Sequence, residues 1–318
     1  MSHAAPSVSP AAAAVGRLSP ARLAALMQPP RPAPVSIRDG RWWAGAVLLA
    51  ISALIVALAV QISFASGLQH ARDQAVGYDE LRTSLAKAVT PVGQLDYEEK
   101  MVAYGTPVAL LEIPSIGLRE VVSQGTTGTV LRSGPGHSAD TVMPGQEGTS
   151  TILGRQASYG GPFNSLTRLA IGAEITVTTG QGAQTFTVFG TRKAGDPLPS
   201  ALAAGQSRLE LVTADGPALL PNGALYIDAQ LTTKAVTTPA FQFSALALPE
   251  ADKPMAMDPS AWIGVFFSMQ WVVLASLGAL WLRRRWGAWQ TWIVSAPVIL
   301  ALAIATADGI GSALPNLI

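Results

Sequence analysis

Three long stretches without a charged residue dominate the hydrophobic pattern of the chain. They run from Trp42 to Ala65, from Trp262 to Leu282 and from Trp286 to Thr306. About 20 apolar residues suffice for a helix to cross the hydrocarbon core of a membrane. The pattern therefore predicts transmembrane helices at 42–65, 261–282 and 286–307, with a re-entrant third segment as the alternative to a full span.

Alternating polar and apolar residues mark the region between the first and second uncharged stretches. Strict alternation over 174–178 and 185–189 is typical of half-buried strands, and Gly180-Gln181-Gly182 between them predicts a hairpin turn. Short strands separated by Gly and Pro turns favour a closed β-barrel of about eight strands, placed at 106–234. The fold class is thus mainly β, with three transmembrane α-helices. The strand candidates are 108–113, 120–122, 149–154, 174–179, 185–191, 209–213 and 225–231.

The remaining segments connect or flank these parts. Residues 1–41 are rich in Pro and Ala and are predicted to be a disordered cytoplasmic tail, with room for a short helix at 20–27. Helical spacing over 68–89 predicts that 66–105 is an extracytoplasmic helical stalk or a helix packed on the domain. Prolines interrupt the linker 235–260. Residues 308–318 form a short C-terminal tail, in which Asp308 is expected to face water.

Arginines set the expected orientation in the membrane. Five of them precede the first span, and Arg283-Arg284-Arg285 directly follow the second. Because cytoplasmic flanks carry the excess of Lys and Arg, the N-terminus is placed in the cytoplasm of a bacterium and the barrel outside the plasma membrane. Ser63-Phe64-Ala65 also resembles a signal-peptide cleavage site. The apolar core of a signal peptide is only about 7–15 residues long, so an uncleaved anchor is favoured.

Composition narrows the function further. Charged residues make up 13% of the 318 positions, and the net charge is +1. A soluble domain averages about 25% charged residues, so the deficit fits a chain in contact with the lipid bilayer, and no basic patch indicates nucleic-acid binding. The chain has no cysteine and 3 scattered histidines, which argues against thiolate chemistry, disulfides and a metal site. No cofactor motif is present.

Five segments, in order and at matching spacing, resemble the sortase family. Leu111–Leu118 is similar to the family's L-x-I-P-x-I-x-L, and Leu131–His137 to L-x-x-G-P-G-H. Pro144–Thr149 resembles a P-G-x-x-G-N turn. Ile152–Arg155 with Tyr159–Phe163 resembles I-A-G-H-R-x-x-Y-G-x-P-F, and Leu211–Gly216 resembles L-V-T-C-D-P. The resemblance covers 108–233 and is nearest to the actinobacterial class E type.

Sortases are extracytoplasmic cysteine transpeptidases, so the resemblance implies an eight-stranded barrel with a groove for a sorting-signal peptide. It also implies a catalytic cysteine, histidine and arginine. Here the matching positions hold Ala214, Arg155 and either Gly223 or Ala224. His137 matches a second histidine of the family that precedes the catalytic one. A methyl group is not a nucleophile, and arginine stays protonated and cannot act as a general base.

The sequence therefore predicts a degenerate sortase that binds or scaffolds a cell-envelope or secreted protein, or a subunit of a membrane complex. The alternatives are a transferase or hydrolase that uses a hydroxyl nucleophile (Thr213, Ser158 or Ser138) and a purely structural membrane subunit. Arg155 either pairs with Asp215 or holds a carboxylate or phosphate ligand. The candidates for lining a peptide groove are His137, Arg155, Tyr159, Phe163, Thr213 and Asp215.

Overall fold

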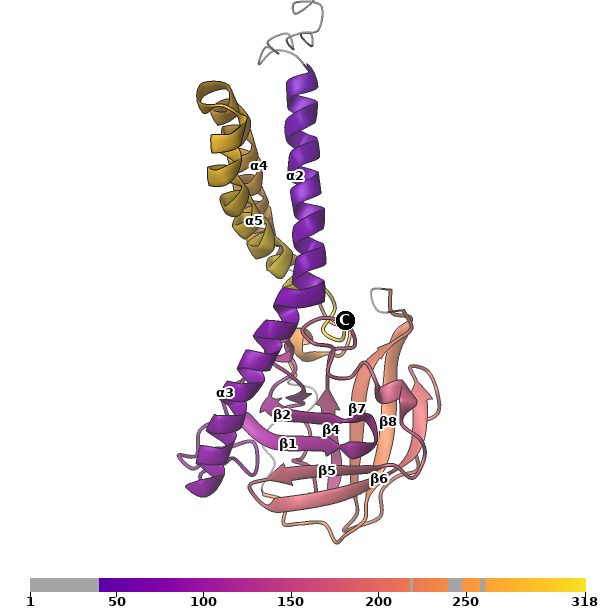
Figure 1. Ribbon diagram of the computed structural model, residues 1–318. Helices are drawn as coiled ribbons and strands as arrows, with labels where there is room; N and C mark the ends of the chain where they lie inside the picture. The colour runs from indigo at the N-terminus through magenta and orange to yellow at the C-terminus, as the bar shows by residue number, and fades with distance from the viewer. Residues whose placement is uncertain (1–39, 218–219, 240–247, 258–260) are drawn as a thin grey trace, which may run out of the picture. The chain divides into compact units, whose positions relative to one another are not determined.

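A closed eight-stranded barrel and four long helices make up the part of the chain that a computed structural model describes, residues 40–217, 220–239, 248–257 and 261–318 (Figure 1). Around the barrel the strands follow the order β1-β2-β3-β4-β7-β8-β6-β5. They are β1 Pro107–Ile113, β2 Leu118–Gln124, β3 Gly136–His137, β4 Gly148–Leu153, β5 Glu174–Thr179, β6 Gly182–Lys193, β7 Ser207–Asp215 and β8 Gly223–Leu231.

Two of the strand pairs are parallel, β2 with β3 and β4 with β7, and the other pairs are antiparallel. Parallel neighbours need a crossover of a dozen or more residues. Between β4 and β7 this crossover contains the β5–β6 hairpin, whose tight turn pairs Thr179 with Gly182. The barrel, seven of its strands and this hairpin confirm the sequence prediction. The eighth strand, β3, has only two residues, too few for an alternation pattern to be seen.

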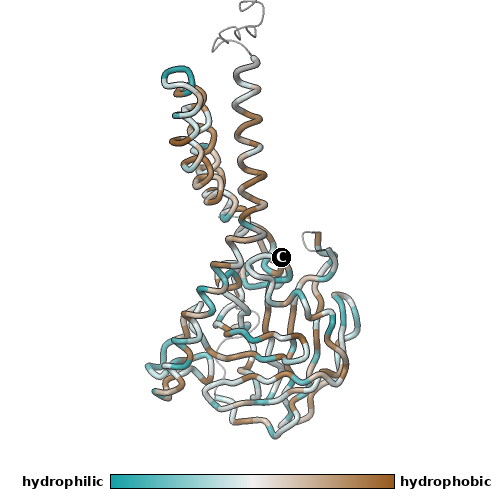
Figure 2. The backbone as a smooth tube through the Cα atoms, in the orientation of Figure 1, coloured by the Kyte–Doolittle hydropathy of each residue, from teal (hydrophilic) through white to brown (hydrophobic). Residues whose placement is uncertain are grey.

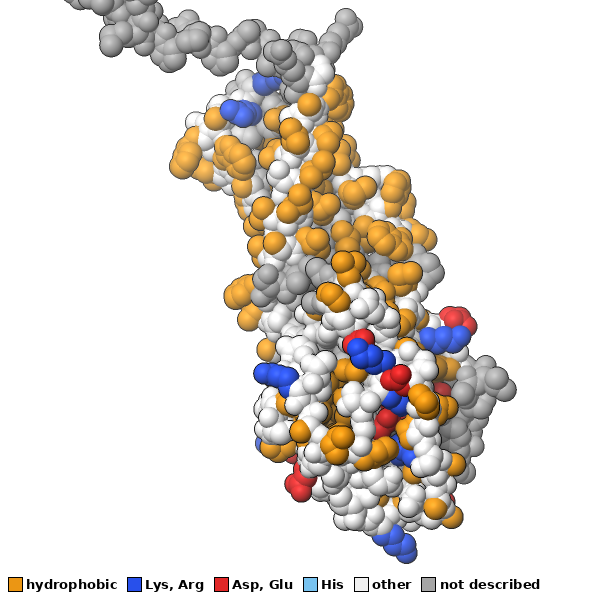
Figure 3. All heavy atoms as spheres, turned by 90° about the vertical axis from the view of Figure 1, so that its right-hand side faces the viewer, with side chains coloured by type: hydrophobic (Ala, Val, Ile, Leu, Met, Phe, Trp, Pro, Cys, Tyr) orange, Lys and Arg blue, Asp and Glu red, His pale blue; other side chains and the backbone are white. Residues whose placement is uncertain are grey.

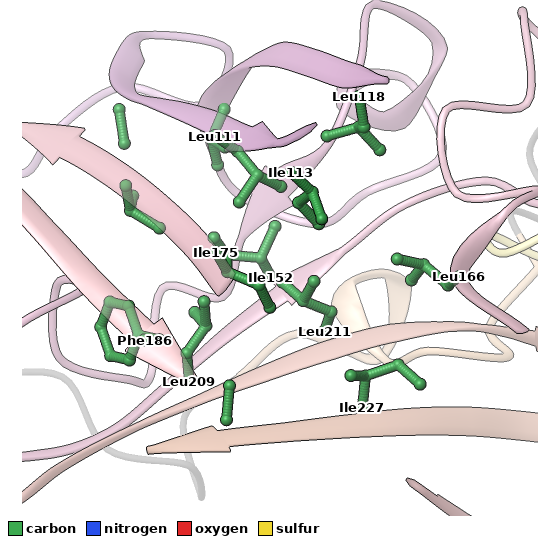
Figure 4. Packing of buried hydrophobic residues seen from close by; sticks show 14 of the residues in the cluster. Leu111, Ile113, Leu118, Ile152, Leu166, Ile175, Phe186, Leu209, Leu211 and Ile227 are labelled. Atoms are coloured by element: carbon green, nitrogen blue, oxygen red, sulfur yellow. The ribbon is translucent and has the colours of Figure 1, made fainter. Parts of the chain in front are cut away.

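Apolar side chains from every long strand fill the inside of the barrel (Figure 4). Ile152 of β4, Leu209 and Leu211 of β7 and Ile227 of β8 are completely buried there. Alternation along β7 explains the arrangement, because Leu209 and Leu211 point inward while Val212 and Ala214 belong to a second cluster with Leu131, Leu153 and Ala224. This second cluster is the floor of the site described below.

Within the described part of the chain, three helices are long and apolar enough to cross a membrane. They are α2 Gly40–Val60, α4 Ala261–Trp286 and α5 Ala288–Ala313, and Figure 2 shows their apolar lengths in brown and the basic turn between α4 and α5 in teal. On the face drawn in Figure 3, hydrophobic side chains cover the helical part and charged side chains gather over the barrel. Large apolar side chains such as Ile293 (59% exposed) and Phe266 (56% exposed) are typical of helices that face lipid.

The helix α3, Ser66–Ala86, packs on the barrel. The side-chain oxygen of Gln74 accepts a hydrogen bond from the backbone N–H of Val121, at 2.6 Å, and its amide nitrogen donates to the carbonyls of Val121 and Ser133. A glutamine in α3 thereby replaces a strand neighbour at the edge of β2. Of the two expectations for this region, these contacts favour a helix packed on the domain over a free stalk.

Two expectations about the chain ends have different outcomes. The predicted disordered tail, 1–41, lies almost wholly outside the described residues, as does the short helix within it. The expected C-terminal tail, 308–318, begins later than predicted. Helix α5 continues to Ala313, and Asn316, Leu317 and Ile318 are buried against the barrel (Figure 1).

Candidate functional site

The positions matched with the catalytic groups of sortases meet at one end of the barrel. Ala214 of β7 pairs with Ala224 of β8, and Asp215 pairs with Gly223 in the next step of the ladder. On the other side of β7, Leu153 of β4 pairs with Val212, and the backbone N–H of Gly154 donates to the carbonyl of Val212. Arg155 follows directly, so adjacent strands place all of these positions together.

Residues 315–318 of the chain occupy this place. They form a turn in which the N–H of Ile318 donates to the carbonyl of Pro315, at 3.0 Å. Leu317 is completely buried in the cluster of Leu131, Leu153, Val212, Ala214 and Ala224. The N–H of Gln156 donates to the carbonyl of Leu317, at 2.9 Å. We call this cluster, together with Arg155, Gln156 and Ser158, the tail site.

Arg155 is the polar centre of the tail site and is completely buried. Its Nη1 donates to the carbonyl oxygen of Ile318 at 3.0 Å and to Ser158 Oγ at 3.1 Å, and its Nη2 donates to the carbonyl of Gly128 at 3.0 Å. Ser158 Oγ donates to the same Ile318 oxygen. Burial lowers the pKa of Arg155 to about 10, so the guanidinium still carries its charge at neutral pH.

Asp308 is the carboxylate nearest this charge, but its ion pair is with another arginine. Arg132 Nη2 lies 2.6 Å from Asp308 Oδ2, while Gln61 Nε2 and the hydroxyl of Tyr159 each donate to Asp308 Oδ1 at 2.9 Å. Asp308 belongs to α5, and these bonds fasten the end of that helix to the barrel. Asp308 is expected from the sequence to face water; its side chain is 30% exposed and is also paired with Arg132, 176 positions away in sequence.

Tyr159 lies between the two arginines. The Cζ atoms of Arg132 and Arg155 are each 5.1 Å from the centre of its ring, within the range of a cation–π contact. Its φ of 50° is in the left-handed region, which a bulky residue rarely adopts. Burial raises the pKa of Tyr159 to about 12, so its hydroxyl stays protonated and donates to Asp308. Of the predicted groove residues, Tyr159 contacts Arg155 through its ring, and Phe163 does so through a backbone N–H that donates to the carbonyl of Arg155 at 3.0 Å.

The other predicted groove residues have other surroundings. Phe163 is part of the barrel core, and the hydroxyl of Thr213 donates to the carbonyl of Gly154. Asp215 pairs with Lys193 at 3.0 Å, so the expected pairing of Arg155 with Asp215 is wrong. His137 is buried, with Nδ1 3.0 Å from Gln124 Oε1 and Nε2 2.9 Å from the carbonyl of Val142.

Sequence reasoning missed Leu317 in the tail site and the ion pair of Asp308 beside it. Leu317 carries no signal, because a leucine near an apolar helix is ordinary. Asp308 did carry one. It is an acidic residue at the end of an apolar stretch, and ionisable residues in such segments are usually paired.

Comparison with known proteins identifies a sortase domain in the region of the barrel. Residues 111–221 match the family model of the sortase domain. Among solved structures, a sortase D5 transpeptidase of Clostridium perfringens shares 21% identity over 51% of this chain and 99% of its own, with a TM-score of 0.42. Sortase E from Streptomyces avermitilis shares 27% identity over 48% of this chain and 99% of its own, with a TM-score of 0.35. No curated protein matches the chain. Residues 111–221 of the chain are thus a sortase domain.

Burial lowers the pKa of His137 to about 4, and this predicts a pH dependence of stability. In the unfolded chain the ring protonates near 6.5. Between these values the unfolded state binds more protons, so the free energy of unfolding falls as the pH is lowered from about 6.5 to about 4, by roughly 3 kcal/mol in total. Urea unfolding of wild type and His137→Gln at pH 7 and pH 4 gives the loss in the free energy of unfolding for each protein. The difference between the two losses is the contribution of His137. Equal losses in both would contradict it.

Arg155→Met should destabilise the protein. The carbonyls of Gly128 and Ile318 lose a charged donor inside the barrel end, and we expect a loss of about 2–4 kcal/mol in the free energy of unfolding. Arg168→Met is the matched control, because Arg168 is exposed and contacts only Ser165 through its side chain among the described residues. Its change should stay within about 0.5 kcal/mol. Similar values for the two variants would show that burial of Arg155 contributes nothing net.

Proposed function

We propose that this chain is a catalytically inactive, membrane-anchored sortase that binds a peptide or protein partner outside the cytoplasmic membrane. The observation that carries the proposal is the tail site itself. It lies at the positions matched with the catalytic groups, and it holds a peptide segment by backbone hydrogen bonds and one leucine pocket. Peptide binding is thus supported by direct contacts, while the groups that would perform transpeptidation are replaced.

The side chains in the tail site do not supply acyl-transfer chemistry. Ala214 offers a methyl group, and the guanidinium of Arg155 has no lone pair with which to accept a proton. A hydroxyl nucleophile needs an adjacent base. The hydroxyls of Thr213 and Ser158 instead donate to backbone carbonyls, those of Gly154 and Ile318. These bonds argue against Thr213 and Ser158 as the nucleophile of a hydrolase or transferase. The third candidate, Ser138, donates to Asp140 Oδ1 and is not a residue of the tail site.

The arrangement in the membrane follows from the same contacts. With the basic turn Arg283–Arg285 in the cytoplasm, α4 leads inward and α5 leads outward. The outer end of α5 then lies on the side of the barrel, as the Arg132–Asp308 ion pair requires. A full span by α5 satisfies both conditions, whereas a re-entrant segment would return its end to the cytoplasmic side. The proposal therefore has three spans, a cytoplasmic N-terminus and an extracytoplasmic barrel.

A purely structural subunit is the second candidate, and the helices favour it. A single span suffices to tether a barrel, yet α4 and α5 add a hairpin with exposed apolar side chains, among them Trp289 at 75%. The two candidates differ in where a partner binds. A peptide-binding protein loses its partner when the tail site is changed, and a structural subunit loses it when the faces of α4 and α5 are changed.

The proposal predicts no cleavage of a sorting-signal peptide by the purified full chain in the presence of hydroxylamine. Ala214→Cys should also be inactive, because a thiol at this position still lacks a base while Arg155 remains. The rate for both proteins is expected to equal that of the peptide alone, followed by chromatography of the products. Cleavage by the wild-type chain above this background would refute catalytic inactivity.

A further inference from the structure

We infer that residues 315–318 are a resident ligand of the tail site, and that a free peptide of the same chemistry binds there when this segment is displaced. The ligand is a turn-forming peptide with a leucine side chain, followed by a residue whose carbonyl oxygen meets Arg155. The inference rests on the proposed function and goes beyond it, because it names the chemistry of the ligand and the segment that competes with it.

Backbone hydrogen bonds hold the segment as they would hold a ligand. The carbonyl of Leu317 accepts from the N–H of Gln156, and the carbonyl of Ile318 accepts from Arg155 and Ser158. At its other end, the N–H of Asn316 donates to the carbonyl of Ala256, at 3.0 Å. Hydrogen bonds to main-chain groups favour one backbone conformation of the ligand. The preference for particular side chains comes from the pocket around Leu317.

A turn of the linker before α4 forms a second wall of the tail site. Asn316 Nδ2 donates to the carbonyls of Ala251, at 2.7 Å, and Lys253, at 3.0 Å. This turn is itself fixed to the barrel, because the buried carboxylate of Asp252 accepts from the N–H of Thr126 and the hydroxyl of Tyr104. The two carbonyls are thus held in place to accept hydrogen bonds from an asparagine side chain. A ligand of the tail site would need a hydrogen-bond donor at this position as well as the leucine.

The pocket for Leu317 is apolar, and two of its lining residues are alanines. Ala214 and Ala224 come from neighbouring strands and share the cluster with Leu317. Burying a leucine side chain stabilises a contact by about 1.5–3 kcal/mol. A charged residue at 317 would lose this gain and place an unpaired charge in the pocket, so Leu317→Asp should expel the segment from the tail site.

The charge of the tail site marks it as a binding site rather than ordinary core. Arg132 pairs with Asp308, and Arg155 lies at the same Tyr159 ring without an aspartate or glutamate partner of its own among the described residues. Arg155 donates to Ser158 Oγ and to the main-chain oxygens of Gly128 and Ile318, and its Nε is buried without a partner among the described residues. A buried charge loses stability with each hydrogen-bond acceptor that is removed, and the Ile318 oxygen is the acceptor that the segment supplies. The occupant must therefore present an acceptor at this point.

A tethered segment has a large advantage over a free peptide. Its effective concentration through a short linker is on the order of millimolar, so a free peptide binds the wild-type chain weakly even where its intrinsic affinity is good. When the segment 315–318 no longer occupies the tail site, the measured Kd approaches the intrinsic one. We expect the apparent Kd of a free peptide to fall at least about tenfold when the segment is expelled.

The experiment uses the full chain in lipid nanodiscs and a fluorescent peptide with the sequence of residues 312–318. Fluorescence anisotropy gives the apparent Kd for wild type, Leu317→Asp and Ile171→Asp. Ile171 lies on the barrel and is 76% exposed, so its variant controls for the added charge. The inference predicts at least about tenfold tighter binding by L317D than by the other two proteins, and loss of this binding when the peptide's own second leucine is replaced by aspartate.

Two outcomes would overturn the inference, and they differ in what they say of the proposed function. Equal binding of the peptide by wild type and L317D would show that the segment does not compete, while peptide binding as such would stand. Absence of binding by L317D, at a stability equal to that of wild type, would overturn the inference and also the proposal that the tail site binds peptides.

A second measurement covers the case in which L317D does not fold. The chain has no cysteine, so L317C introduces a single thiol, which is smaller than the leucine and fits the same pocket. Its reaction with a maleimide should be at least about tenfold slower than that of I171C, because it proceeds only through opening of the segment. The fluorescent peptide in excess should accelerate it by occupying the opened tail site. Equal rates for the two thiols, or no acceleration, would overturn the inference.

Discussion

Burying the guanidinium of Arg155 at the end of the barrel is the constraint on which the surrounding structure depends. A buried charge is costly unless it is hydrogen-bonded. Here the bonds come from three segments far apart in sequence: the loop at Gly128, the turn at Ser158 and the residue Ile318 after α5. Because one side chain needs all three, the membrane hairpin and the barrel are held in contact through it. Tyr159 in a strained backbone conformation is part of the same arrangement.

The residues that differ from the sortase pattern also fit one another. Alanine at 214 and 224 keeps a pocket open between two strands, and arginine at 155 offers donors beside that pocket. A cysteine at 214 and an arginine at 223 or 224 would fill the volume that Leu317 occupies. A histidine at 155 would remove the guanidinium that donates to the carbonyl of Ile318. In the proposed function, loss of the catalytic side chains and binding of the segment are one change in the site.

Much of the barrel could be predicted from the sequence, whereas its occupant could not. Alternation is a local property, so the hairpin at 179–182 and strand β7 follow from a few residues each. The convergence of Ala214 and Ala224 followed from family spacing. Strand β3 and the contacts of Leu317 arise from pairings over long sequence distances, and the bond from Arg155 to Ile318 spans 163 positions. Nothing in a short apolar segment indicates which distant pocket it enters.

The short connection between α5 and the tail site has a geometric consequence. Helix α5 ends at Ala313, and Leu317 is already inside the pocket. Four residues extend at most about 14 Å, so with α5 in the bilayer the pocket opens within that height above the membrane surface. A secreted protein diffusing freely would have to insert a chain into this narrow zone. A partner tethered in the same membrane, with an exposed segment next to its own span, delivers it there at no extra cost in orientation.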